Sequence, residues 1–158
     1  MEKNTKELTI SRIFDAPREL VFKAWTDPEL LAKWWGPRGV TNPECEVDAQ
    51  VGGAIHITML AGEELGPLAG QRWPMKGTFI ELTPPDRIVF SNQAVDENDN
   101  VLIDGITTVI FEEKDSKTIM TLHVIARGIS AESPQMLAGM NQGWSESIDK
   151  LTELLEKS

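Results

Sequence analysis

Histidine, cysteine and tyrosine, whose side chains bind metals, carry protons or act as nucleophiles, are scarce in this 158-residue chain. It contains two histidines, His56 and His123, one cysteine, Cys45, and no tyrosine. A metal site needs several convergent Cys, His or carboxylate ligands, and neither histidine belongs to a two-histidine helical motif. We therefore predict no metal site, and acid, base or nucleophile chemistry by tyrosine is excluded.

Motifs for nucleophilic catalysis and phosphate binding are also missing from the sequence. There is no Gly-x-Ser-x-Gly elbow, and a lone cysteine is more often a small buried hydrophobe, which fits the alternation of Cys45 with Val47. Gly52-Gly53 lacks a following Gly-Lys-Ser/Thr and indicates a tight turn. The 25 Asp and Glu residues offer no acid–base pair that sequence alone can select. We predict no catalytic residue and no cofactor.

His56 alternates with Ile55 and Ile57 in a strand-like segment, so its side chain should face the opposite way from theirs. That direction leads either to solvent or to a cavity. Two interpretations stay open, a structural histidine and a polar contact to a bound molecule.

Tryptophan and methionine are the informative residue types, with five Trp and six Met in the chain. Flexible thioethers and large aromatic rings suit adaptable apolar surfaces. Trp34 and Trp35 are adjacent in a helical segment, where neighbours point roughly 100° apart. We expect at least one of the two rings to face a cavity mouth or a partner. The alternative is that both wedge short helices against a sheet.

Hydrophobic periodicity predicts the elements that would position these side chains. Alternation over residues 8–14 indicates a first strand. Two short helices should follow: Pro17 suits the first turn of one, and Thr26 and Glu29 have capping-box spacing at the start of the other. Turn signals then separate six further strands, predicted over 44–49, 54–60, 71–82, 87–95, 102–113 and 118–127.

A long helix should close the chain, because Ser133-Pro134 is a start signal and one apolar stripe follows at helical spacing: Met136, Met140, Trp144, Ile148, Leu151 and Leu155. Short connections between strands indicate an antiparallel meander. We expect one α+β domain over residues 1–158, in which a curved antiparallel sheet of about seven strands wraps around the long C-terminal helix. Such a wrap commonly leaves a cavity between helix and sheet.

The charge balance excludes two classes of partner. Fifteen Lys and Arg against 25 Asp and Glu give a formal net charge of −10, which repels nucleic acid and anionic membranes. No apolar run approaches the roughly 20 residues that span a bilayer. The polar first seven residues lack the apolar core of a signal peptide, so we expect a cytoplasmic protein.

The chain resembles the SRPBCC or START-like superfamily over nearly its whole length, specifically the branch called activator of heat-shock-protein-90 ATPase homologue-like. The residues that carry the resemblance are Phe14-Asp15-Ala16-Pro17, Val21–Pro28, Trp34-Trp35-Gly36-Pro37, Gly52-Gly53, Pro74-Met75-Lys76-Gly77, Pro84-Pro85, Gly139–Trp144, Ser147, Leu151 and Leu154. The resemblance implies a helix-grip fold, which hosts unrelated activities. Relatives bind lipids, hydrophobic natural products or hormones, some cyclise polyketides, and the namesake stimulates a chaperone's ATPase. The namesake has an additional domain for which 158 residues leave no room, so a chaperone partner is the weaker expectation.

The leading hypothesis is non-enzymatic binding of a small, largely apolar molecule between the long helix and the sheet, under the N-terminal half of that helix. The expected ligand contacts are Trp34, Trp35, His56, Met59, Trp73, Met75, Phe79, Phe90, Met136, Met140 and Trp144. Two alternatives stay open. One is an interaction module that modulates a chaperone or forms a homodimer through the Trp34-Trp35 surface, and the other is a cyclase or hydrolase that uses a cavity histidine or carboxylate.

Overall fold

Seven strands form one antiparallel sheet in the order β1-β7-β6-β5-β4-β3-β2 in the computed structural model, which describes residues 5–96, 98–129 and 137–156. The strands are β1 (Thr5–Phe14), β2 (Val40–Val47), β3 (Ala54–Ala61), β4 (Arg72–Thr83), β5 (Arg87–Val95), β6 (Val101–Lys114) and β7 (Lys117–Gly128). Strands β2 to β7 pair with their neighbours in sequence, as short connections require. The predicted antiparallel meander is confirmed.

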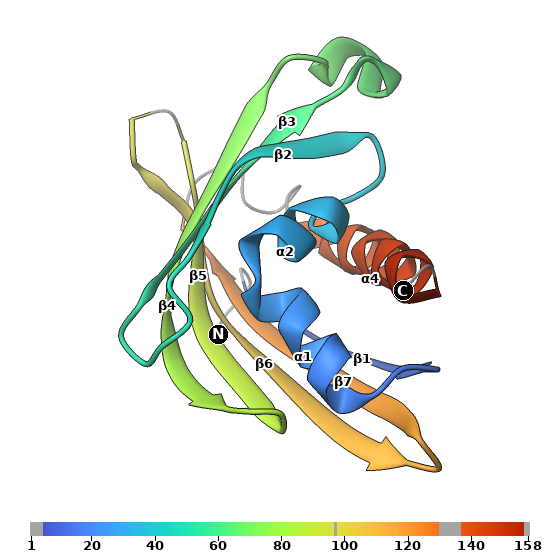
Figure 1. Cartoon of the computed structure of the whole chain (residues 1–158). Helices are drawn as coiled ribbons and strands as arrows, with labels where there is room; N and C mark the ends of the chain where they lie inside the picture. The colour runs from blue at the N-terminus through green and yellow to red at the C-terminus, as the bar shows by residue number, and fades with distance from the viewer. Residues whose placement is uncertain (1–4, 97, 130–136, 157–158) are drawn as a thin grey trace.

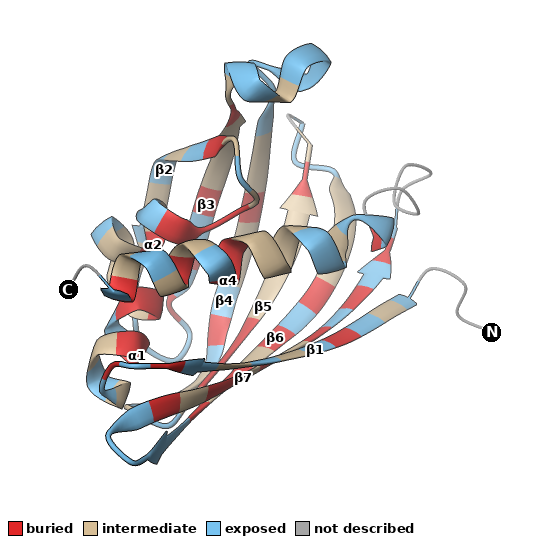
Figure 2. Ribbon diagram, turned by 90° about the vertical axis from the view of Figure 1, so that its right-hand side faces the viewer, coloured by how far each residue is buried: buried red, intermediate tan, exposed pale blue. Residues whose placement is uncertain are grey.

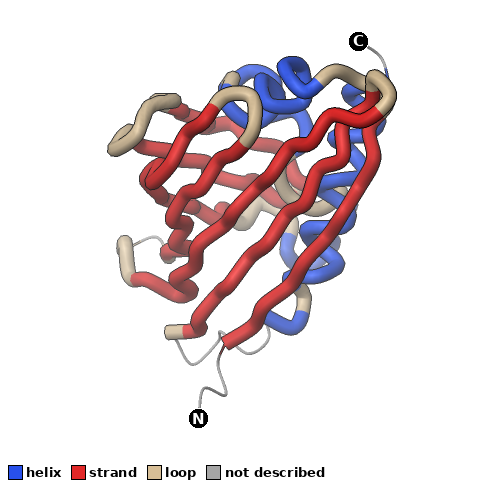
Figure 3. The backbone as a smooth tube through the Cα atoms, turned by 90° about the horizontal axis from the view of Figure 1, so that it is seen from below, coloured by secondary structure: helices blue, strands red, loops and turns tan. Residues whose placement is uncertain are grey.

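Helices α1 (Arg18–Thr26), α2 (Pro28–Trp34) and α4 (Met140–Glu156) lie inside the curve of the sheet (Figures 1 and 3). A short 3-10 helix, η1 (Glu63–Leu68), joins β3 to β4. Figure 2 shows α4 crossing the sheet. This arrangement confirms the expected helix-grip architecture, in which α4 covers the concave face.

Strand alternation divides the sheet into a buried concave face and an exposed outer face. In β3, Ile55 and Ile57 are buried while His56 between them is exposed, and a similar alternation runs along β7 (Figure 2). Ile148 and Leu151 of α4 are fully buried against the concave face. Each such side chain contributes roughly 1.5–3 kcal/mol through burial, so the long helix is fixed mainly by its C-terminal half.

Two element starts differ from the sequence prediction. Asp27, not Thr26, caps α2: its carboxylate accepts a hydrogen bond from the Glu29 backbone N–H at 2.9 Å. Thr26 is still inside α1, where its hydroxyl donates to the Phe22 carbonyl, so it cannot take the extended cap conformation. The predicted helix start at Ser133-Pro134 lies outside the described residues.

Strand β2 begins at Val40, before the predicted start at residue 44. The pairing of β2 with β3 shifts register between Thr41 and Glu44, on either side of Pro43. Proline cannot donate to the ladder, and the irregularity breaks the alternation by which the strand would be recognised. The helical turn η1 was also not predicted.

Candidate functional site

Both adjacent tryptophans are buried, Trp34 with 0% and Trp35 with 7% of its surface exposed. Helix α2 ends at Trp34, and Trp35 has an extended backbone (φ −64°, ψ 137°). The roughly 100° separation of helical neighbours therefore does not apply to this pair. The expectation that one ring faces a cavity mouth or a partner is wrong, and no exposed Trp34-Trp35 surface is available for a dimer.

Four tryptophans, Trp25, Trp34, Trp35 and Trp144, form one aromatic group that we call the tryptophan cluster. The Trp25 ring lies 4.7 Å from Trp34 and stacks on Trp144 at 6.2 Å, and Trp35 meets Trp144 edge-on at 5.2 Å. Phe90 of β5 lies 6.4 Å from both Trp25 and Trp35. The rings join α1, α2, α4 and the sheet, so much of the expected cavity is filled by side chains.

The indole N–H groups of the tryptophan cluster differ in how they are satisfied. Trp34 Nε1 donates to the Ala24 carbonyl at 2.9 Å, which ties α2 to α1. Trp25 Nε1 is buried and has no acceptor among the residues that the structure describes. Leaving a buried donor unpaired costs about 1–3 kcal/mol.

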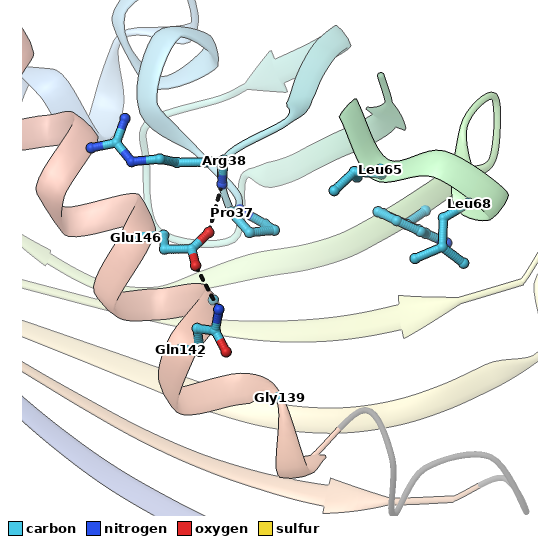
Figure 4. Close-up of a pocket in the computed structure, with 9 residues that line it drawn as sticks. Pro37, Arg38, Leu65, Leu68, Gly139, Gln142 and Glu146 are labelled. Carbon is cyan, nitrogen blue, oxygen red and sulfur yellow. Dashed lines mark hydrogen bonds between the residues drawn. The ribbon is translucent and has the colours of Figure 1, made fainter. Parts of the chain in front are cut away.

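An open groove of about 340 Å³ lies at the mouth of the fold, between the first turns of α4, the turn after α2 and η1. We call it the α4 groove. Its residues are Pro37, Arg38, Leu65, Leu68, Trp73, Gly139, Gln142, Gly143 and Glu146, and Figure 4 shows Leu65 and Leu68 across from the α4 side chains. Leucine, proline and tryptophan side chains make one part of its wall apolar, and Gln142 and Glu146 of α4 and Arg38 of the turn after α2 are its polar residues.

The polar edge of the α4 groove is held by hydrogen bonds to Glu146. Its Oε1 accepts from the Arg38 backbone N–H at 2.9 Å, and its Oε2 accepts from Gln142 Nε2 at 2.8 Å (Figure 4). The bonds from Gln142 and from the Arg38 backbone both favour the ionised carboxylate and lower the pKa of Glu146. The groove therefore has a fixed negative group at its rim.

Lys150 and Arg38 connect the turn after α2 to a more C-terminal part of α4. Lys150 Nζ donates to the carbonyls of Trp35 and Pro37 at 3.4 and 3.3 Å, and Arg38 forms an ion pair with Glu153. Burial is the main cause that lowers the pKa of Lys150. These contacts fix the α2 side of the groove relative to α4.

Gly36 allows the turn to pack closely on the sheet. Its φ of +88° favours glycine, and a Cβ there would lie 2.6 Å from Met59 Sδ and 2.8 Å from Val40 Cγ2. Met59, an expected ligand contact, therefore packs beneath this turn.

The remaining predicted ligand contacts divide between the core and the groove. Met75, Phe79 and Phe90 are core residues with 7%, 1% and 1% exposure. Trp73 lines the α4 groove, while Met140 and Trp144 are partly buried against the core. Met136 lies outside the described residues.

The cavity reading of His56 is wrong, because its side chain lies on the outer face of the sheet. It is exposed and borders a second hollow of about 240 Å³, together with Glu44, Glu46 and Lys76. His56 therefore does not face the space between α4 and the sheet. Within the described ranges, no group of three or more His, Cys, Asp or Glu residues could hold a metal ion, and no helix is long and apolar enough to cross a bilayer.

Sequence reasoning missed Leu65, Leu68, Gln142 and Glu146 as groove residues. Leu65 and Leu68 lie in a short segment with glycines at 62, 66 and 70, a composition that indicates only a loop. Their apolar side chains within that loop were the available signal. Gln142 and Glu146 are spaced for one face of a helix, but polar residues at that spacing ordinarily face solvent.

Cys45 should react slowly with alkylating agents in the folded protein. The residue pairs with Ile57 across β2 and β3 and packs against the core, and burial raises the pKa of its thiol from 9.0 to about 11. At pH 8 the reactive thiolate should be about 100-fold scarcer than in the unfolded chain. Iodoacetamide labelling followed by mass spectrometry, with and without urea, measures this ratio. Equal labelling rates in both conditions would contradict the partial burial of Cys45.

Comparison with known proteins gives a consistent family assignment. The family model described as Activator of Hsp90 ATPase homolog 1-like protein matches residues 15–156. A solved structure from Chromobacterium violaceum is 31% identical, with a TM-score of 0.78 and 97% of each chain covered. The AHSA1 protein from Silicibacter pomeroyi is 25% identical, with a TM-score of 0.76 and coverage of 96% of this chain and 98% of that chain. No curated protein matches the chain.

Proposed function

Because the chain belongs to the family of Activator of Hsp90 ATPase homolog 1-like proteins, we propose that it binds a small, largely apolar molecule, without catalysis, in the α4 groove. Proteins with the fold of the SRPBCC superfamily, to which this family belongs, generally bind ligands. The observation that carries the proposal is an apolar wall that faces an open space of about 340 Å³. This volume lies at the lower end of the roughly 300–1,000 Å³ typical of ligand pockets, which favours a small ligand.

Leu68 supports this placement, because its side chain lines the groove and 45% of its surface is exposed (Figure 4). Trp73, on the neighbouring strand β4, presents a partly buried ring to the same space. A ligand that covered both would remove apolar surface from water at about 25 cal/mol per Å². The side chains of Gln142 and Glu146 would then orient the ligand rather than supply most of its affinity.

The same geometry argues against the cyclase or hydrolase alternative. That alternative uses a cavity histidine or carboxylate and predicts that His56 lies in the pocket near Asp or Glu, whereas His56 lies on the outer face. Among the described residues that line the α4 groove, Glu146 is the single carboxylate and there is no histidine or cysteine. Acid–base chemistry would need a partner group that this lining does not supply.

The neutral fluorescent probe N-phenyl-1-naphthylamine tests the proposal by titration, because it avoids repulsion by the net charge of −10. We expect Leu68→Asp to weaken probe binding about tenfold, since it removes an apolar contact and places a charge in the apolar wall of the groove. Val51→Asp is the matched control: Val51 is 65% exposed in the turn between β2 and β3 and does not line the groove. That variant should keep the affinity of the unmodified protein.

Two outcomes would contradict the proposed site. If the unmodified protein does not enhance the emission of the probe, the apolar-ligand function fails and the interaction-module alternative replaces it. If Leu68→Asp and Val51→Asp bind the probe equally well, an apolar molecule binds elsewhere. Thermal unfolding of both variants checks that any loss of binding does not reflect unfolding.

A further inference from the structure

The side-chain amide of Asn92, in β5, lies on the mostly apolar concave face of the sheet. Strand alternation puts it on the same face as the buried Phe90. Thr107 of β6 is fully buried, and its hydroxyl donates to Asn92 Oδ1 at 2.9 Å. This bond uses the amide oxygen and leaves Asn92 Nδ2 as a donor that has no acceptor among the described residues.

Small residues surround Asn92 on this face. It lies opposite Gly77 of β4 on one side and Gly105 of β6 on the other, and neither has a side chain that could cover the amide. Ala94 is the next residue along β5 on the same face. Both Asn92 and Ala94 are partly accessible although α4 crosses this face of the sheet (Figure 2). Part of the surface of both residues is therefore accessible.

Asn92 lies inward of the α4 groove along the strands of the sheet. Trp73 lines the groove on β4, and Gly77, which faces Asn92, is four residues further along the same strand. At roughly 3.3 Å per residue, this separation is about 13 Å. Met75, between them on the same face, is buried in this structure, and its flexible thioether side chain would have to move to admit an occupant. An elongated molecule of about this length would reach from the groove to the amide.

We propose that Asn92, held by Thr107, donates a hydrogen bond to a neutral acceptor at the inner end of the ligand, such as a ketone or ester carbonyl oxygen. This inference rests on the proposed function and specifies the chemistry of its ligand. A neutral acceptor fits better than a carboxylate, because Glu146 is at the rim and the chain has a net charge of −10. Thr107 acts as a positioning residue, since its hydroxyl fixes the amide oxygen and so orients the amino group.

Two neutral probes test the inference in parallel. The first is 6-propionyl-2-(dimethylamino)naphthalene, which is elongated and has a carbonyl acceptor, and the second is N-phenyl-1-naphthylamine, which has no carbonyl. We expect Asn92→Leu to weaken binding of the carbonyl probe about tenfold and to change binding of the other less than about twofold. Thr107→Val keeps the shape of the side chain but removes the hydroxyl, and it should also weaken binding of the carbonyl probe. The carbonyl probe's emission should also shift to the blue when the hydrogen bond is lost.

Gln93→Leu is the matched control, because Gln93 is the next residue of β5, faces the outer side and bonds to Asp104. It should leave both affinities unchanged. Equal weakening of both probes by Asn92→Leu would mean that Asn92 only packs, and would overturn the inference while the proposed function stands. Failure of both probes to bind the unmodified protein would overturn the proposed function and the inference together. If Asn92→Leu does not fold, the probe comparison in Thr107→Val decides between these outcomes.

Discussion

Replacing Trp34 with alanine is expected to lower the free energy of unfolding by about 3–5 kcal/mol. Its ring is fully buried, 4.7 Å from Trp25 and 6.0 Å from Trp35, so truncation leaves a cavity in the tryptophan cluster. The Ala24 carbonyl would also lose the hydrogen bond from Trp34 Nε1. Urea denaturation followed by circular dichroism measures the loss.

Trp73→Ala is the matched control for this prediction. Trp73 is partly exposed in the α4 groove, and its indole N–H bonds to the side chain of Gln71 at 3.3 Å. We expect this substitution to lower the free energy of unfolding by only about 1 kcal/mol. Its main effect should be weaker binding of the probe. Equal stability losses in the two variants would mean that Trp34 does not occupy a packed core position.

Gly77→Ala is expected to cost about 3 kcal/mol of stability, because no space exists for a methyl group between β4 and β5. An ideal Cβ at Gly77 would lie 1.9 Å from the Ser91 carbonyl oxygen and 3.0 Å from its carbon, which are backbone atoms. The two strands would have to separate to admit the methyl group. Thermal or urea unfolding measures the effect.

The control for Gly77→Ala is the same substitution at Gly143, in α4. Among the described residues, no atom outside the helix lies within 4 Å of a Cβ built there, and alanine forms helix better than glycine. Gly143→Ala should therefore raise stability by about 0.5–1 kcal/mol. If Gly77→Ala unfolds at the same urea concentration as the unmodified protein, the strands β4 and β5 do not approach each other as closely at this residue as the structure shows.

The sequence predicted the fold well because its hydrophobic periods match the elements. Alternation marked the strands, and the apolar stripe from Met140 to Leu155 marked α4. Local exceptions were missed for local reasons. Pro43 interrupts the pairing of β2, and Asp27 serves as both the end of α1 and the cap of α2, a double role that spacing from Thr26 could not reveal.

The site was harder to predict, because sequence does not show which apolar residues fill space and which border it. Phe90 has the residue type expected of a ligand contact, yet it packs against Trp25 in the core. Apolar residues also occur on the outer face of the sheet, where Ile106 and Ile125 are paired and 48% and 44% exposed. Trp73, an expected ligand contact, lines the α4 groove, whereas the apolar wall at Leu68 depends on the position of η1, which the sequence did not indicate.

The central claim is that an apolar molecule occupies the α4 groove. Two-dimensional NMR of nitrogen-15-labelled protein during titration with N-phenyl-1-naphthylamine tests it most directly. We predict that the largest shifts occur at the backbone amides of Leu65, Leu68, Gln142 and Gly143 and at the indole N–H of Trp73, all in the groove lining. Shifts confined to the outer face of the sheet, or no shifts at saturating probe, would contradict the claim.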